Sequence, residues 1–315
     1  VSSAASDVYK RQRQTHAALM KLDFLAVSEI FMTPTAALAD IVLPAATHFE
    51  FNDIGHYGLG HGYILARPKI VDAPEECWPD IKILNELGKS LCPAAHWYED
   101  YNDILETLLA PSGLDFGQFA EQGYLKGSDQ FKKYNVSGFK TPSGKVELSL
   151  SRAAKLKVSP LPDFNGYPVP EDPEYPLVLT SAKSRYYLHS SYRWLEKLRK
   201  KLPHPQALIH PETAADCGIQ NNDEIIIETP HGRIIQVAHL TEAVAPRVIY
   251  AAYGWWFPEE KPEALYKWDR SNFNILTATD NLGREFGTPN LKGINCRIRK
   301  VRGEDKLSNN SISWR

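Results

Sequence analysis

Short apolar runs separated by turns organise the first part of the chain. Phe24–Phe31 and Ala39–Ala46 are two such runs, and the small-residue segment between them predicts a short connector. A strand, a connector and a second strand in this order are typical of an α/β layer. Pro44 ends the second strand because proline cannot donate to a strand ladder. The Gly-rich stretch 52–63 then predicts a loop.

Helical spacing follows that loop. The segment 98–110 predicts one amphipathic helix, and the segment 79–92 predicts another, whose apolar side is formed by Ile81, Leu84, Leu87 and Leu91. Ser143–Ser151 alternates apolar and polar residues as a strand does. The Pro-rich stretch 158–176 has no periodicity and predicts a linker, which puts a domain boundary near residue 172.

Strand-like patterns dominate after the linker. Short β-branched strands are predicted at 176–182, 223–229, 233–240 and 247–253. Helices are predicted at 190–202 and, opened by Pro211, at 210–218. Several short strands joined by close turns predict a small closed barrel, because closure removes exposed strand edges.

Composition narrows the classes of function. The chain has 315 residues, is 43% hydrophobic and 23% charged, and carries a net charge of -2, which are ordinary globular values. We expect neither a nucleic-acid partner nor a direct membrane span, since there is no single-sign field and no apolar run of about 18 residues. The four cysteines form no CxxC pair, so the sequence carries no local zinc or iron–sulfur signature.

Both ends of the chain look unlike the rest. Residues 1–21 are interpreted as a non-native or disordered leader, because the opening VSSAASDVYKRQRQ lacks a Met start and apolar periodicity. Residues 303–315 are interpreted as a polar tail. The sequence enters a strand-like run directly from Leu22, so we expect the front of a larger protein to be missing.

Five segments in series resemble conserved blocks of one enzyme family. They are FMTPTAALADIVLPAATHFE (31–50), TPSGKVEL (141–148), LVLTSAKSRYYLHSSYRWL (177–195), IHPETAADCGIQNNDEIIIETPHGRI (209–234) and VIYAAYGWW (248–256). Their order and spacing resemble the molybdopterin oxidoreductases of the dimethyl sulfoxide reductase superfamily, and the resemblance runs from about residue 22 to residue 301.

The resemblance implies a fold and a cofactor. Residues 22–172 would form a partial Rossmann-like α/β lobe, and residues 173–302 a six-stranded double-psi β-barrel. Family members hold a molybdenum or tungsten ion between two molybdopterin guanine dinucleotides. Their N-terminal portion usually supplies a [4Fe-4S] cluster and the residue that ligates the metal, neither of which has a counterpart here. The chain is therefore interpreted as a C-terminal fragment, and no residue is assigned as a metal ligand.

The implied partners are the pterin cofactor, a small-molecule substrate and an iron–sulfur electron-transfer subunit. The sequence leaves open the substrate, the choice of metal and the cellular compartment, because the family handles many substrates and any signal would lie upstream.

The loop after the strand at 176–182 carries the first group of candidate cofactor contacts. Small and hydrogen-bonding side chains are gathered there, and an ammonium group could meet a phosphate; the candidates are Ser181, Lys183, Ser184, His189 and Ser190. The alternative is a strand-to-helix turn in which Ser190 is an N-cap.

Later segments supply a second group of candidates. Gly254 permits close backbone approach, Trp255 would flank a ring system, and Lys292 would meet a phosphate. Asn272 and Asn274 offer the paired donor and acceptor groups that suit a guanine or pterin edge. The alternatives are an ordinary core aromatic at Trp255, a loop role for Asn272 and a solvated Lys292.

The opening segment offers further candidates. Thr33 and Thr35 place hydroxyls at a strand end, where open α/β sheets bind ligands, and Asp53 is a third candidate cofactor contact. His48, Glu50 and His56 are candidate catalytic residues for proton transfer. The alternative is a buried hydrogen-bonded network that holds the loop. His61, in the same Gly-rich loop, is a further candidate for substrate or proton chemistry.

Two functions remain open on the sequence. The first is the C-terminal part of a molybdopterin-dependent oxidoreductase that binds the cofactor and shapes the substrate funnel, and that is inactive as a fragment. The second is a non-catalytic scaffold or binding module of the same fold without a cofactor. A metal-ligating residue and cysteine cluster spacing upstream would discriminate the two.

Overall fold

The computed structural model describes residues 12–56, 62–127, 131–161, 171–277, 292–303 and 305. The chain divides into two compact units. The barrel unit comprises Val1–Val27, Phe31–Asp40 and Arg152–Arg315, and the hairpin unit comprises Ser28–Ile30 and Ile41–Ser151. The division differs from the predicted boundary near residue 172, because the chain crosses between the units before residue 41 as well as near residue 151.

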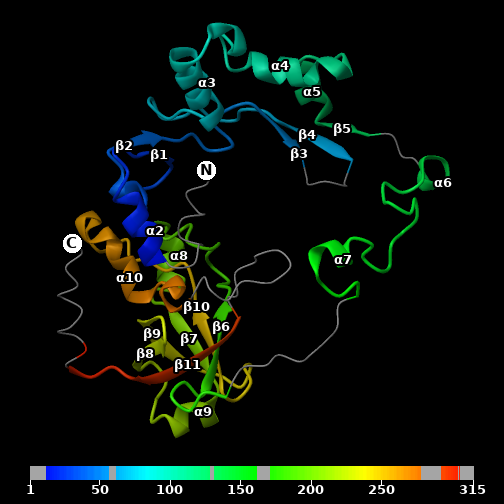
Figure 1. Ribbon diagram of the computed structural model, residues 1–315. Helices are drawn as coiled ribbons and strands as arrows, with labels where there is room; N and C mark the ends of the chain where they lie inside the picture. Colours follow the sequence, from blue (N-terminus) through cyan, green and yellow to red (C-terminus); the bar gives the residue numbers. More distant parts are fainter. Residues whose placement is uncertain are drawn as a thin grey trace. The chain divides into compact units, whose positions relative to one another are not determined.

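Six strands of the barrel unit close into the predicted barrel (Figure 1). Around the barrel the order is β10-β6-β11-β8-β9-β7. Two pairs are parallel, β10 with β6 and β7 with β9, and the remaining pairs are antiparallel. The strands are β6 (Leu177–Ala182), β7 (Gln206–Ile209), β8 (Glu224–Thr229), β9 (Gly232–Leu240), β10 (Val248–Ala252) and β11 (Lys292–Lys300). The predicted closed barrel is therefore confirmed.

Branched aliphatic side chains fill the barrel. The fully buried members include Leu179, Ile209, Ile225, Ile227 and Ile249, each with 0% exposure. Each such side chain contributes about 1.5–3 kcal/mol on leaving water. Alternation along β7 and β10 sends every second residue inward, which is why the period-two pattern could be found from the sequence.

Short helices surround the barrel. α9 (Pro211–Asp216) begins with proline as predicted, and its N-cap His210 accepts a hydrogen bond from the Glu212 amide. α8 (Glu196–Lys201) is shorter than predicted, because Tyr192 has a φ of 68° and interrupts the helical path before it. η4 (Pro262–Lys267), α10 (Trp268–Ser271) and η5 (Phe273–Leu276) follow β10.

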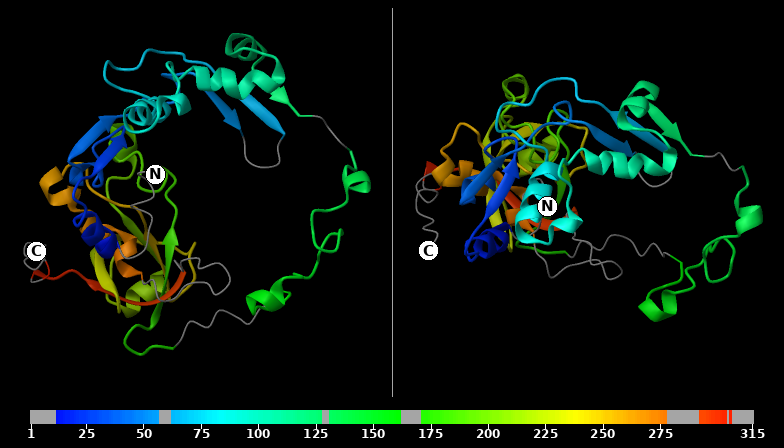
Figure 2. Two further views of the ribbon diagram at one scale, coloured as in Figure 1. Left: turned by 45° about the horizontal axis from the view of Figure 1, so that its top comes forward. Right: turned by 90° about the horizontal axis from the view of Figure 1, so that it is seen from above.

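The predicted leader contains a helix. α2 (Gln12–Leu19) lies beside the segment of α10 in both views of Figure 2, with the His16 ring 6.2 Å from that of Trp268. Burial lowers the pKa of His16, and Asp269 partly opposes this shift. Residues 12–19 are therefore ordered and pack on the barrel unit, which leaves the non-native alternative for residues 1–21 as a prediction.

The hairpin unit is built on an antiparallel sheet of β3 (Asp53–His56), β4 (Tyr63–Arg67) and β5 (Tyr124–Lys126). β1 (Ala26–Glu29) pairs with β2 (Ile41–Pro44), as the apolar runs predicted. The remaining elements up to residue 137 are α3 (Asp80–Leu91), η2 (Ala94–His96), α4 (Asp103–Leu109), η3 (Ala110–Ser112), α5 (Phe116–Gln122) and α6 (Tyr134–Ser137), while α7 (Ala153–Leu156) belongs to the barrel unit.

Its small core is formed by α4 and α5 against the sheet. Leu105, Leu109, Phe116 and Phe119 pack together, with Phe119 fully buried. Asp115 begins α5 with a capping box, since its carboxylate accepts from the Gln118 amide and the Gln118 side chain accepts from the Asp115 amide.

Two sequence predictions for the hairpin unit are wrong. Ser143–Ser151 forms no strand, because the Ser143 and Thr141 hydroxyls bond locally to the Lys145 carbonyl, and such contacts compete with a strand ladder. The predicted loop at 52–63 begins as a strand, Asp53–His56. The predicted helix at 79–92 is confirmed as α3, and on its apolar side Leu84 is 62% exposed and Leu91 80% exposed.

Membrane insertion was not expected from the composition. None of the helices in the described ranges is long and apolar enough to cross a membrane.

Candidate functional site

Two loops leave the barrel at the same edge. β6 and β10 are neighbouring parallel strands, with Ser181 opposite Ala251 in register, so the segments after them emerge side by side. We call them the β6 loop (residues 183–195) and the β10 loop (residues 253–257). Six of the twelve predicted cofactor contacts of the barrel unit lie in these loops, which places those six candidates at one end of the barrel.

The two loops are joined by direct contacts. The Tyr253 hydroxyl lies 3.0 Å from His189 Nδ1, and Trp256 Nε1 donates to the Ser190 carbonyl at 2.9 Å. Burial raises the pKa of Tyr253, with the Arg193 charge opposing the shift, so the phenol keeps its proton near neutral pH.

Gly254 allows these loops to meet. It has a φ of 63°, and a Cβ there would lie 2.9 Å from both the His189 carbonyl carbon and the Ser190 nitrogen. The sequence predicted that this glycine permits close backbone approach. The partner in that approach is the β6 loop itself.

Arg193 belongs to the β6 loop, and its side chain reaches the β10 loop. It was not among the residues that the sequence singled out. Its side chain is 1% exposed, and its guanidinium stacks 4.0 Å from the ring centre of Tyr187 and 4.2 Å from that of Trp255. Its Nη2 donates to the carbonyls of His189, at 3.1 Å, and Gly254, at 3.0 Å. The aromatic-rich setting SSYRWL was the only signal in the sequence, and it does not distinguish a stacked arginine from a solvated one.

Trp255 forms part of an aromatic cluster. It is fully buried, and its ring meets those of Tyr187 and Phe257 edge-on at 5.4 and 6.4 Å. This supports the core-aromatic alternative for the ring. Its indole N–H, however, has no hydrogen-bond partner in the part of the chain that the structure describes.

Asn272 and Asn274 shape a buried turn after α10. Asn272 Oδ1 accepts from the Asn274 amide at 3.0 Å, and the Thr277 hydroxyl donates to the Asn274 carbonyl at 3.0 Å. The loop role of Asn272 is thus present, but its Nδ2 is buried and lacks a partner among the described residues. A buried donor without an acceptor costs about 1–3 kcal/mol, so Trp255 and Asn272 each mark a position where an acceptor would stabilise the protein.

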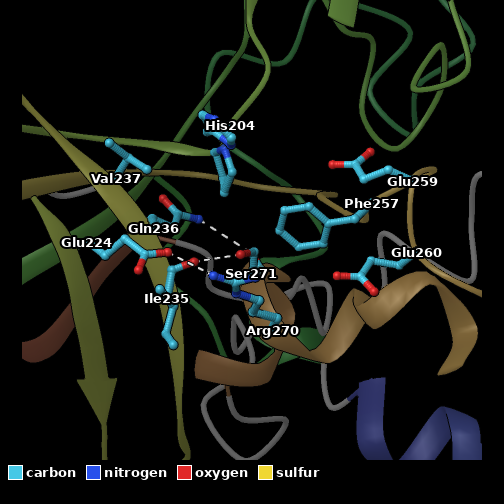
Figure 3. A pocket seen from close by; sticks show the side chains of 11 residues that line it. His204, Glu224, Ile235, Gln236, Val237, Phe257, Glu259, Glu260, Arg270 and Ser271 are labelled. Atoms are coloured by element: carbon cyan, nitrogen blue, oxygen red, sulfur yellow. Dashed lines mark hydrogen bonds and ion pairs between the residues drawn. The ribbon is translucent and has the colours of Figure 1, made fainter. Parts of the chain in front are cut away.

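A pocket of about 150 Å³ is lined in part by Arg270 and Ser271, the residues that lead into this turn (Figure 3). Arg270 pairs with Glu224 at 2.8 Å, the Ser271 hydroxyl donates to the Ile235 carbonyl, and the Gln236 amide faces Ser271. These groups form hydrogen bonds and an ion pair with one another. The bonds from Ser271 to Ile235 and Gln236 hold α10 against β9 and thereby fix where Asn272 lies.

The remaining candidates of the barrel unit have simpler surroundings. Ser184 accepts from the amides of Tyr186 and Tyr187, which makes it a turn residue, and Lys183 is exposed. Ser190 is buried and does not cap a helix, since α8 begins after Leu195. Lys292 is the exposed first residue of β11.

The segment 31–40 belongs to this same unit. Trp194 Nε1 donates to the Met32 carbonyl at 2.9 Å, and the Trp194 ring packs against Trp256 at 5.9 Å. Thr33 accepts from the Ala36 amide, and Thr35 precedes η1 (Ala36–Leu38). Thr33 and Thr35 are therefore held on the barrel unit by Trp194.

The candidates of the hairpin unit have local partners. The centre of the His48 ring lies 4.1 Å from that of Phe49, with the ring planes tilted by 43°, and Glu50 accepts from the Thr47 amide at 2.6 Å. Asp53 forms an ion pair with Arg67 at 3.2 Å. Between the described side chains, no hydrogen bond joins His48 to either carboxylate. His56 ends β3, and its side chain and His61 lie outside the described residues.

The described residues offer no obvious metal centre. No group of three or more His, Cys, Asp or Glu side chains among them could hold a metal ion. The β10 loop carries one buried donor without a partner among the described residues, Trp255 Nε1, and the turn after α10 carries another, Asn272 Nδ2.

Two family models match the chain in order. Residues 7–90 match the molybdopterin oxidoreductase model, and residues 177–295 match the molydopterin dinucleotide binding domain. The second match covers strands β6 to β10, the first part of β11, and both the β6 loop and the β10 loop. The chain belongs to the molybdopterin oxidoreductase family, as the five segments predicted.

Individual relatives agree with this assignment. The chain is 31% identical over 300 residues to acetylene hydratase of Syntrophotalea acetylenica, and the match covers 90% of this chain and 41% of the relative. It is 27% identical over 311 residues to a dimethyl sulfoxide/trimethylamine N-oxide reductase of Cereibacter sphaeroides, covering 88% and 37% respectively.

A solved structure is also similar. The acetylene hydratase from Pelobacter acetylenicus matches with a TM-score of 0.88 at 30% identity, over 96% of this chain and 44% of that chain. The chain thus spans less than half the length of these relatives.

Proposed function

We propose that the chain forms one part of the cofactor site of a bis-molybdopterin guanine dinucleotide oxidoreductase that contains molybdenum or tungsten. The observation that carries the proposal is the match of residues 177–295 to the molydopterin dinucleotide binding domain, a region in which Trp255 Nε1 and Asn272 Nδ2 are buried donors without a partner among the described residues. A pterin dinucleotide is rich in oxygen and nitrogen acceptors, so it would satisfy donors that the described protein groups leave unmet.

The residues of the barrel unit suit such a ligand. Lys183 and Lys292 are exposed ammonium groups at strand ends, where phosphates would find opposite charge. Ser181, Ser190 and His189 add short hydrogen-bonding groups, and Thr33, Thr35 and Asn274 complete the set of proposed contacts. When bound, the metal and pterin supply the redox or oxygen-transfer chemistry. The protein groups bind the cofactor, orient it and exclude water from it.

Proton transfer is proposed for the hairpin unit. His48, Glu50 and His56 are the candidates, and a histidine and a carboxylate are the side chains most often used for general acid–base catalysis. Asp53 is a weaker candidate for cofactor binding, because its ion pair with Arg67 already gives it a structural role.

The finer architecture belongs to the same proposal. It comprises the double-psi connectivity of the barrel, the Rossmann-like character of the 22–172 lobe, and the substrate funnel. Other parts of the whole protein would supply the metal-ligating residue and a [4Fe-4S] cluster. An iron–sulfur electron-transfer subunit would be a separate partner. The relatives include both a hydratase and a reductase by name, so the similarity does not select a substrate.

The cofactor content of the full-length protein tests the proposal against the scaffold alternative. The protein that includes this chain is produced in a host that makes the dinucleotide cofactor, then denatured. Released guanosine monophosphate is quantified by chromatography, oxidised pterin by fluorescence, and molybdenum and tungsten by mass spectrometry. We expect equal amounts of pterin and nucleotide together with one of the metals. Protein that contains none of them would support the scaffold function instead.

A further inference from the structure

We propose that Arg193 is a positioning residue that holds the β6 loop and the β10 loop in their ligand-binding conformation. The inference rests on the proposed function, and it assigns a role to a residue that does not itself need to touch the cofactor.

The surroundings of Arg193 show a fixed guanidinium. It is 1% exposed, and its central carbon lies over the rings of Tyr187 and Trp255, 4.0 and 4.2 Å from their centres. A guanidinium stacks well on aromatic faces and keeps its planar fork of donors while doing so. The stack therefore fixes the direction in which the donors point, which a flexible lysine could not reproduce.

The donors reach two segments that are far apart in sequence. Nη2 bonds the carbonyl of His189 in the β6 loop and that of Gly254 in the β10 loop, two residues that both have positive φ, 52° and 63°. An L-residue such as His189 adopts this conformation only when its surroundings favour it. Charge-assisted hydrogen bonds to both carbonyls stabilise the two unusual conformations together.

Peptide planarity carries the effect to the ligand side. In a trans peptide the N–H of the next residue points opposite to the carbonyl. With both carbonyls directed at Arg193, the N–H groups of Ser190 and Trp255 point away from the guanidinium. Backbone N–H groups presented in this way bind phosphate and other anionic oxygens, which the dinucleotide would supply.

Arg199 is a matched control. Its guanidinium also lies over the Trp255 ring, at 5.5 Å, but it pairs with the Glu259 carboxylate rather than with a loop carbonyl. Substitution of Arg199 by Met therefore removes the same kind of side chain from the same aromatic cluster without removing the bonds to His189 and Gly254.

The experiment measures how fast the holoprotein loses its cofactor. Wild type, Arg193→Met, Arg193→Lys and Arg199→Met are incubated at one temperature below all of their melting temperatures, and released pterin and guanosine monophosphate are followed with time. Loss of charge-assisted hydrogen bonds predicts release about tenfold faster or more for Arg193→Met. We expect Arg193→Lys to lie between it and wild type, and Arg199→Met to match wild type within about twofold.

Ile227→Val separates positioning from general stability. Ile227 is fully buried in β8, remote in sequence from both loops, and its truncation lowers the melting temperature of the barrel. It should leave the release rate unchanged. The positioning role of Arg193 is refuted if Arg193→Met releases cofactor no faster than Arg199→Met. It is also refuted if Ile227→Val accelerates release as much as Arg193→Met. Arg193→Lys provides the same comparison if Arg193→Met does not fold. Wild-type protein without pterin would refute the proposed function, and the positioning role of Arg193 with it.

Discussion

Replacement of Gly254 by alanine tests how the two loops fit together. Two costs add at this position. A left-handed conformation costs an L-residue about 1–2 kcal/mol, and here φ is 63°. The new Cβ would also lie 2.9 Å from the backbone of His189 and Ser190, and such overpacking costs about 1–3 kcal/mol. We therefore expect the free energy of unfolding to fall by ~2–5 kcal/mol, a large part of a typical total of 5–15 kcal/mol.

Gly218→Ala is the control for conformational strain alone. Gly218 follows α9 with a φ of 64°, and a Cβ there would meet no atom within 4 Å. This variant should lose only ~1–2 kcal/mol. Urea unfolding followed by tryptophan fluorescence gives both values, since Trp255 and Trp256 adjoin Gly254. If Gly254→Ala is no less stable than Gly218→Ala, the loops do not meet backbone to backbone as described.

Three further predictions follow from the contacts already described. Trp255→Phe removes a buried donor without a partner but leaves a small cavity, and these effects oppose each other. The melting temperature of the cofactor-free protein should therefore stay nearly unchanged, whereas bound pterin per protein should fall. Arg299 holds the pKa of Asp305 well below its usual range. The stability from this pair is therefore present above the unfolded pKa near 4 and is lost as pH falls through the folded pKa. The stability of Asp305→Asn should not show this decrease in acid unfolding. Phe119→Ala opens the core of the hairpin unit and should cost about 3–5 kcal/mol in urea unfolding, whereas an unchanged midpoint would contradict the described packing.

The barrel could be predicted because its signals are local. Strands β8, β9 and β10 carry β-branched residues, a tight turn joins β8 to β9, and α9 carries its own Pro start, so neighbouring residues specify each element. The site loops could be located for the same reason, since they follow strands that the alternation had already marked.

The failures depend on contacts that no local pattern records. Ser143–Ser151 alternates like a strand, yet the hydroxyl of Thr141 bonds the Lys145 carbonyl and gives the backbone a turn instead. Arg193 looked like one of many surface arginines, because its burial depends on Tyr187 and on the distant Trp255. Leu91 has the spacing of a core residue but is 80% exposed, since helical spacing indicates which side is apolar and not what covers it.

The segment 31–40 has a consequence for dissecting the protein. It packs with the barrel unit through the Trp194–Met32 hydrogen bond, although it is flanked on both sides by residues of the hairpin unit. A single proteolytic cut in the linker at 158–176 would therefore not yield two independent fragments. The nicked halves would co-purify, because the N-terminal piece still carries a segment that is bound to the barrel. A barrel excised from residue 152 onward would lack that segment and would expose more of the Trp194 side chain, which is already 37% exposed.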